Sequence, residues 1–304
     1  MLQTDERQQS DRAYVCPQCK GELETGKDQL VCRPCGARYS ILDEIPDFTL
    51  QDLSQSDSPI MRGVEQIDRL APIYETKLWY PMVLKLYGGW KSPSLQEIAR
   101  LFSTIVAPVE GQILDVACGP ATYGRRMASP TKTVYGIDIS MGMLRQGASY
   151  IERDRIPNVY LARARVEALP FRPAFFDGAV CGGSLHLFAD TVAALREIGA
   201  VMKEDAPLAV MTFCAGERGI LRFRRVRDRV EQDHGTHILE LPELKGYLAE
   251  AGFTDFQPQV YGSLLVFSAR RGGSPAPFPG AVVAAGAERC PCSGAHAGDP
   301  GGVV

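Results

Sequence analysis

The feature that most constrains the fold is a short apolar run at residues 113–116 that breaks at once into small residues at 117–121. The run contains one acid, Asp115. An apolar run bounded by turn residues predicts a buried strand, and the small residues after it predict a tight turn into a helix. Because small side chains let the backbone approach a ligand closely, we expect the polar end of a ligand to lie against this turn.

From residue 95 onward, helical and strand-like patterns alternate. The sequence predicts helices near 94–106, 122–129, 140–153, 190–203 and 241–251, and strands near 112–117, 133–138, 158–163, 176–181 and 207–213. This alternation is typical of a doubly wound α/β fold, in which helices cover both faces of a mostly parallel sheet. Two last strands around Gly262, at 255–261 and 263–269, predict an antiparallel hairpin at the C-terminal end of the domain.

Two Cys-x-x-Cys pairs lie near the N-terminus, with twelve residues between them. Each pair presents two thiolates on one side of a turn, and a hairpin that joins the turns completes a tetrahedral zinc site. Four cysteines leave no open coordination position, so the metal is expected to be structural. The alternative, four unpaired or redox cysteines, would leave this small segment without the free energy to fold. The predicted ligands are Cys16, Cys19, Cys32 and Cys35.

Composition divides the chain into six parts. We expect a disordered segment at 1–12, a zinc ribbon at 13–50, a linker at 51–60, a helical cap at 61–93, the α/β domain at 94–271 and a disordered tail at 272–304. The aromatic cap either packs on the main domain or forms a lid that faces a ligand. In the tail, Cys290 and Cys292 either bind metal or are incidental.

Overall charge and hydropathy exclude several classes of protein. The formal net charge is -3, so no global basic field favours nucleic acid over the whole surface. No run approaches the length of a membrane span, and the first ten residues are polar, unlike a secretory signal. The nine cysteines include the two close pairs, which fits a metal site in a reducing compartment. We therefore expect a cytoplasmic protein with no membrane contact.

A second acid lies where the next predicted strand ends. Asp138 ends the strand at 133–138, and an acid in this place can accept hydrogen bonds from both hydroxyls of a ribose. Asp115 and Asp138 together predict a ligand that contains a nucleoside.

Here the sequence resembles a known family, the class I S-adenosylmethionine-dependent methyltransferases. The similar segments are 113–121, 135–144, 168–171, 176–180 and 184–187. Segments 78–81, 87–90 and 235–238 further resemble the methyltransferase type 11-like proteins that carry a four-cysteine ribbon before this domain. The resemblance covers about residues 14–270 and implies a Rossmann-like sheet that binds S-adenosylmethionine.

The resemblance also assigns cofactor-binding roles. It implies that the turn shapes the methionine end of the pocket, that Asp138 holds the ribose, that apolar residues flank the adenine, and that Cys181 and Gly182 line the floor below the sulfonium. The remaining residues that it implies are Asp115, Ala117, Cys118 and Gly119 in the turn, and Ile139, Met143, Arg165 and Val166 around the adenine.

Three positions depart from the family pattern. Ala117 and Ala121 stand where the family has glycines, which matters if either position needs a positive φ. Arg165 stands where an acid usually accepts the adenine amino group, and an arginine has no acceptor. An alternative hypothesis is therefore a non-catalytic or repurposed binding module.

Two histidines and one basic segment are candidates for activating or binding the acceptor substrate. His186 and His237 are candidate bases, which are needed only if the nucleophile must lose a proton, and each could instead be a packing residue. Residues 222–229 carry five arginines, which could bind phosphates or could belong to a solvated helix with an apolar stripe and internal ion pairs.

The favoured function is methyl transfer from S-adenosylmethionine to O or C of a small, partly apolar molecule. The alternative enzyme is an RNA base methyltransferase that uses the ribbon and the Arg222 to Arg229 patch. A protein partner could dock on the ribbon.

Overall fold

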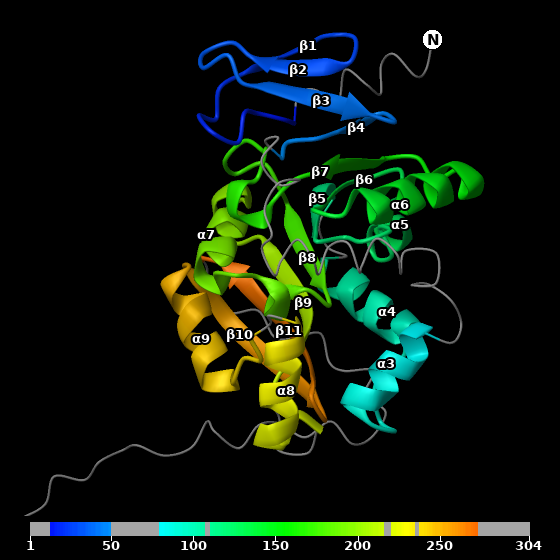
Figure 1. The fold of residues 1–304 in the computed structure, drawn as a ribbon, viewed down its shortest axis with the longest axis vertical. Coiled ribbons are helices and arrows are strands. Elements are labelled where there is room, and N and C mark those ends of the chain that lie inside the picture. Colours follow the sequence, from blue (N-terminus) through cyan, green and yellow to red (C-terminus); the bar gives the residue numbers. More distant parts are fainter. Residues whose placement is uncertain (1–12, 50–78, 107–109, 216–219, 235–236, 273–304) are drawn as a thin grey trace, which may run out of the picture.

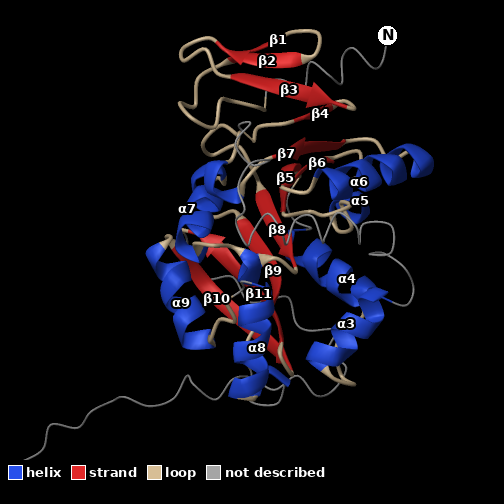
Figure 2. Cartoon of the chain, viewed as in Figure 1, coloured by secondary structure: helices blue, strands red, loops and turns tan. Residues whose placement is uncertain are grey.

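The computed structural model describes residues 13–49, 79–106, 110–215, 220–234 and 237–272. A small antiparallel sheet at the N-terminal end lies against a large sheet that has helices on both sides (Figures 1 and 2). Residues 1–12, the linker, the first part of the predicted cap and the tail with Cys290 and Cys292 lie outside the described residues. Within the described ranges, no helix combines the length and apolar character that crossing a membrane requires.

The small sheet contains four strands, paired antiparallel in the order β1-β2-β3-β4. The cysteine turns lie before β1 and after β2, so pairing of β1 with β2 brings the turns together. Its strands are β1 (Leu23–Thr25), β2 (Gln29–Cys32), β3 (Arg38–Leu42) and β4 (Ile45–Pro46).

The large sheet has the order β10-β11-β9-β8-β5-β6-β7, and this confirms the predicted α/β fold class. Five strands are parallel, and β11 pairs antiparallel with both β9 and β10, as the predicted closing hairpin requires. The chain leaves β5 for β6 on one side and later returns to β8 on the other, so ligands are expected at the carboxyl ends of these strands. The strands are β5 (Gly111–Val116), β6 (Lys132–Asp138), β7 (Val159–Arg163), β8 (Gly178–Gly182), β9 (Pro207–Phe213), β10 (Phe253–Tyr261) and β11 (Leu264–Arg271).

Helices cover both faces of this sheet. The helices are α3 (Trp79–Gly88), α4 (Leu95–Val106), α5 (Gly124–Met127), α6 (Met141–Asp154), α7 (Thr191–Val201), α8 (Arg224–His234) and α9 (Leu241–Glu250), with short 3-10 turns η2 (Val166–Ala168), η3 (Leu185–Leu187) and η4 (Ile220–Arg222). The prediction of a helix over 122–129 was wrong in extent, because α5 has four residues and Ala128 already has an extended backbone. Ser140 begins α6 by accepting a hydrogen bond from the Met143 amide at 3.0 Å.

Two core layers fix the sheet. On the α7 and α9 side, Phe171, Phe176 and Leu195 are fully buried, and on the other side α4 buries Ile98 and Phe102. In α3, Tyr80 and Leu84 join the α4 layer, so the described part of the cap packs on the main domain. Met82, Leu86 and Trp90 stay exposed.

Candidate active site and metal site

Asp115 lies at the end of β5 and is completely buried. Its Oδ2 accepts a hydrogen bond from the Gly124 amide at 2.8 Å, whereas its Oδ1 has no hydrogen-bond partner among the described residues. Burial and the nearby charge of Asp138 raise the pKa of this carboxyl to about 7, against the opposing effect of the Gly124 hydrogen bond. A buried acceptor left over in this turn fits the ammonium group of S-adenosylmethionine, which is a hydrogen-bond donor.

The turn after β5 contains the two alanines that stand where the family has glycines, and its backbone has the positive φ angles that glycine usually provides. Ala117 and Ala121 both have positive φ, at 50° and 56°, and Gly119 between them has φ of 55°. An L-residue in this region costs about 1–2 kcal/mol, so both alanines keep the turn at an energetic cost. The turn itself is therefore formed despite the missing glycines.

Asp138 links the end of β6 to this turn. Its Oδ2 accepts from the Gly119 amide at 2.8 Å and its Oδ1 accepts from the Ser140 amide, also at 2.8 Å. These two bonds fix the carboxylate, and a carboxylate can accept several hydrogen bonds at once.

The expected adenine side lies at the ends of β6 and β7. Met143 and Val166 are buried, and the Ile139 carbonyl accepts a hydrogen bond from Arg163 Nε at 2.8 Å. Arg165 Nε lies 3.4 Å from Glu167 Oε2, so the arginine pairs with the neighbouring acid and supplies no acceptor.

The expected floor below the sulfonium is tightly packed. A Cβ on Gly182 would lie 2.0 Å from a ring carbon of Tyr123, so only glycine fits beside this ring. The Tyr123 hydroxyl in turn lies 2.9 Å from that of Tyr80 in α3. Burial raises the pKa of Cys181 to about 12 and that of Cys118 well above its usual range, so both remain thiols.

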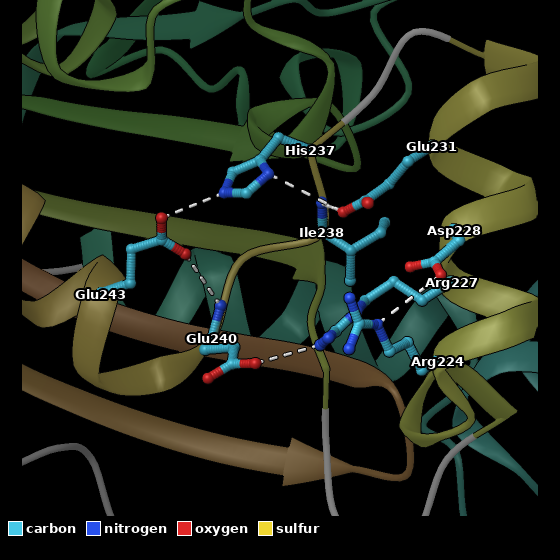
Figure 3. A pocket seen from close by; sticks show the side chains of 8 residues that line it. All are labelled: Arg224, Arg227, Asp228, Glu231, His237, Ile238, Glu240 and Glu243. Carbon is cyan, nitrogen blue, oxygen red and sulfur yellow. Dashed lines mark hydrogen bonds and ion pairs between the residues drawn. The ribbon is translucent and has the colours of Figure 1, made fainter.

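The two candidate bases lie on adjoining segments, because the His237 amide donates to the His186 carbonyl at 3.1 Å. His186 is buried, with Nδ1 3.1 Å from Thr212 Oγ1 and its ring 4.9 Å from that of Phe213. The His237 side chain is 57% exposed and lies between two acids (Figure 3). Its Nε2 is 3.0 Å from Glu243 Oε1, and its Nδ1 is 3.7 Å from Glu231 Oε1.

His237 lines a pocket of about 250 Å³ between α8 and α9 (Figure 3). Burial raises the pKa of Glu243, but hydrogen bonds with His237, Tyr247 and the Glu240 amide outweigh it, so the net pKa is lowered. The pocket therefore presents an ionised carboxylate beside an imidazole. The lining residues are Arg224, Arg227, Asp228, Glu231, His237, Ile238, Glu240 and Glu243.

Two arginines of the predicted basic patch are paired within the protein. Arg227 Nη1 lies 3.0 Å from Glu240 Oε1, and Arg224 Nε lies 3.7 Å from Asp228 Oδ2. The alternative of a helix with an apolar stripe is met in part: Leu221 is fully buried, but Ile220 and Phe223 are exposed. The stripe is interrupted because η4 turns before α8 begins.

The four N-terminal cysteines converge as predicted. Their sulfur atoms all lie within 4.8 Å of one another, with Cys16 and Cys35 3.7 Å apart and Cys19 and Cys32 3.4 Å apart. Sulfur ligands at about 2.3 Å from a tetrahedral zinc are separated by similar distances, so the cluster fits this ion. The Tyr39 hydroxyl lies 3.2 Å from Cys16 Sγ and links the cluster to the ribbon's core.

Sequence reasoning missed two parts of this arrangement. It did not pair Arg163 with Ile139, and it did not place Tyr123 over Gly182. The only local signal for the second is that Tyr123 follows the small-residue turn directly. Arg163 gives no local signal, because its partners come from other segments of the chain.

The mostly parallel sheet, the turn after β5 and the acid at the end of β6 agree with the resemblance to class I S-adenosylmethionine-dependent methyltransferases. Residues 113–205 match the family model described as a methyltransferase domain. The chain therefore carries a methyltransferase domain and is similar to S-adenosylmethionine-dependent methyltransferases.

Known proteins are similar over different shares of the chain. An uncharacterized chloroplastic methyltransferase of Arabidopsis thaliana, At2g41040, is 27% identical over 263 residues, which cover 79% of this chain and 69% of that protein. Demethylmenaquinone methyltransferase of Listeria welshimeri is 28% identical over 145 residues, which cover 47% and 58%. Among solved structures, Haemonchus contortus phosphoethanolamine N-methyltransferase 2 with S-adenosylhomocysteine has a TM-score of 0.55 at 14% identity, covering 69% of this chain and 58% of that one.

Proposed function

We propose that this methyltransferase acts on a small, partly apolar acceptor, at oxygen or carbon. Bound S-adenosylmethionine supplies an electrophilic methyl group. Asp115 Oδ1, which has no partner within the described residues, would accept from its ammonium and Asp138 from its ribose hydroxyls, while Ile139, Met143 and Val166 would surround the adenine. The four cysteines hold a structural zinc.

The observation that carries the acceptor class is the aromatic surface at the end of β9. The Phe213 ring lies 4.4 Å from that of Tyr87 in α3 and 4.9 Å from the His186 ring. His186 joins this apolar surface to the segment of His237, which lines a pocket of about 250 Å³ with mostly charged walls. The similarity to a demethylmenaquinone methyltransferase agrees with an acceptor that has an apolar part.

His237 is the better placed of the two candidate bases. Its ring is accessible, and Glu231 and Glu243 lie beside both nitrogens, where their charges balance the positive charge of a ring that has accepted a proton. His186 is buried and bonded to Thr212, so we assign it to shaping the acceptor surface.

The test separates cellular acceptors by size. The full chain is incubated with S-adenosylmethionine and either the low-molecular-mass fraction or the RNA fraction of a cell extract, and S-adenosylhomocysteine formation is measured. We expect product with the small molecules and none with Asp138→Ala. Product with RNA alone, together with binding that weakens steeply with salt and in an Arg224→Ala/Arg225→Ala variant, would overturn the proposal in favour of an RNA methyltransferase.

A further inference from the structure

The ribbon extends the open edge of the large sheet. Asp47, just after β4, forms a parallel bridge with Arg163 at the end of β7, and the Phe48 amide donates to the Arg163 carbonyl at 2.8 Å. Figure 1 shows β4 beside β7. The Phe48 ring is buried against Tyr14 and Tyr39, with ring centroids 5.2 and 5.3 Å apart. The ribbon and the methyltransferase domain therefore share a core.

The Arg163 side chain joins the ribbon to the loop after β6. Arg163 is paired in register with Asp138, the expected ribose ligand. Its Nη1 lies 3.1 Å from Asp47 Oδ2, and its Nε donates to the Ile139 carbonyl at 2.8 Å. The Arg163 and Asp47 side chains are only 19% and 12% exposed, so water screens this pair weakly.

A second contact joins the first cysteine turn to the loop beyond Val166. Lys20, one residue after Cys19, donates to the Leu169 carbonyl at 2.9 Å and pairs with Glu197 at 3.2 Å. The Val15 amide, one residue before Cys16, donates to the Pro170 carbonyl at 2.9 Å. Residues on both sides of the cysteine turn thus hold the loop that carries Val166.

We propose that the ribbon positions the adenine side of the cofactor site, with Asp47 and Arg163 as positioning residues that fix the Ile139 carbonyl. This inference rests on the proposed cofactor site. A metal-ordered ribbon holds both loops before the cofactor arrives, so less conformational freedom is lost on binding. Ribbon integrity then sets cofactor affinity, although no ribbon residue contacts the reacting atoms.

The experiment compares two ion pairs that cross the same boundary. Asp47→Asn weakens the largely buried pair with Arg163, whereas Asp43→Asn weakens an exposed pair in which Asp43 Oδ2 lies 2.8 Å from Arg145 Nε on α6. Calorimetry with S-adenosylhomocysteine is expected to give an affinity about three- to thirtyfold weaker for Asp47→Asn. The Asp43→Asn control is expected to bind as the parent does.

If Asp47 had only a structural role, the loss of affinity in Asp47→Asn would not be confined to the nucleoside part of the ligand. 5′-Methylthioadenosine, which lacks the amino-acid part, is therefore expected to lose affinity by the same factor in Asp47→Asn. Zinc content and circular dichroism show whether the variant is folded and metal-bound, and Arg163→Lys provides a second variant with the charge retained. A loss seen with S-adenosylhomocysteine but not with methylthioadenosine would overturn the inference.

The outcomes separate this inference from the proposed function. If the parent protein does not bind S-adenosylhomocysteine, both fail. If the parent binds, Asp138→Ala weakens binding as expected, and both Asp47→Asn and Arg163→Lys bind unchanged, the cofactor site stands and the positioning role of the ribbon is overturned.

Discussion

The cofactor side and the acceptor side of this site are built differently. On the proposed cofactor side, β5, β6, β7 and the ribbon hold Asp115, Asp138 and Ile139 with buried or partly buried hydrogen bonds. On the proposed acceptor side, α8 and α9 present ion pairs, and His237 and Phe223 are exposed. The first arrangement fixes one ligand geometry, whereas the second leaves side chains able to adapt to the acceptor.

The largest expected effect is on stability: a substitution in the ribbon should lower the free energy of unfolding much more than a substitution on the acceptor side. Cys32→Ser removes a buried ligand, and because metal binding supplies much of the folding free energy of a small ribbon, the free energy of unfolding should fall by more than about 4 kcal/mol. Zinc content should fall with it. His237→Gln on the acceptor side should change the unfolding midpoint little, because its ring is mostly exposed.

Cys181→Ser is the control for loss of a buried cysteine. It should keep the zinc content of the parent. Equal zinc content in Cys32→Ser and the parent, measured by atomic absorption, would refute the four-cysteine site.

The second effect is on affinity. Asp138→Ala removes the expected ribose ligand, and loss of two hydrogen bonds to a charged group should weaken S-adenosylhomocysteine binding about a hundredfold. Asp154→Ala removes an exposed acid paired with Arg153 at the end of α6, and should bind as the parent does. Equal calorimetric affinities for the two variants would place the ribose elsewhere.

The third effect depends on pH. Folding raises the Asp115 pKa from 3.8 to about 7, so the folded protein holds a proton that the unfolded chain releases. The stabilising contribution is complete below about pH 4 and is lost as the pH rises to about 7. Affinity for S-adenosylhomocysteine should rise over the upper part of this range, because ionised Asp115 pairs best with an ammonium group.

Asp115→Asn is the matched variant for this effect. Chemical unfolding of the cofactor-free protein between pH 4 and 8 should show a smaller decline for Asp115→Asn than for the parent. Identical pH profiles would mean that Asp115 does not titrate in this range.

The smallest effect concerns the turn itself. Ala117→Gly should stabilise the protein by about 1 kcal/mol, because glycine accepts the positive φ without strain. Ala148→Gly in the helical interior of α6 should destabilise it by about 1 kcal/mol. Thermal unfolding measures both, and a destabilising Ala117→Gly would show that the alanine makes a contact worth more than its strain.

Features that depend on local sequence patterns could be predicted, whereas contacts between distant segments could not. The strands, the turn and the four cysteines depend on local patterns, and the structure confirms the fold class and brings the cysteines together. The pairing of Asp47 with Arg163 depends on how the ribbon packs, and nothing near either residue indicates it. Similarly, His237 meets Glu231 and Glu243 only because its segment lies between α8, which carries Glu231, and α9, which carries Glu243.

The most direct test of the central claim is calorimetry of the full zinc-bound chain with S-adenosylhomocysteine. If S-adenosylhomocysteine binds at Asp115 and Asp138, we expect one binding site per chain, measurable heat and a raised unfolding temperature. Absence of both heat and thermal stabilisation at millimolar ligand would contradict the account.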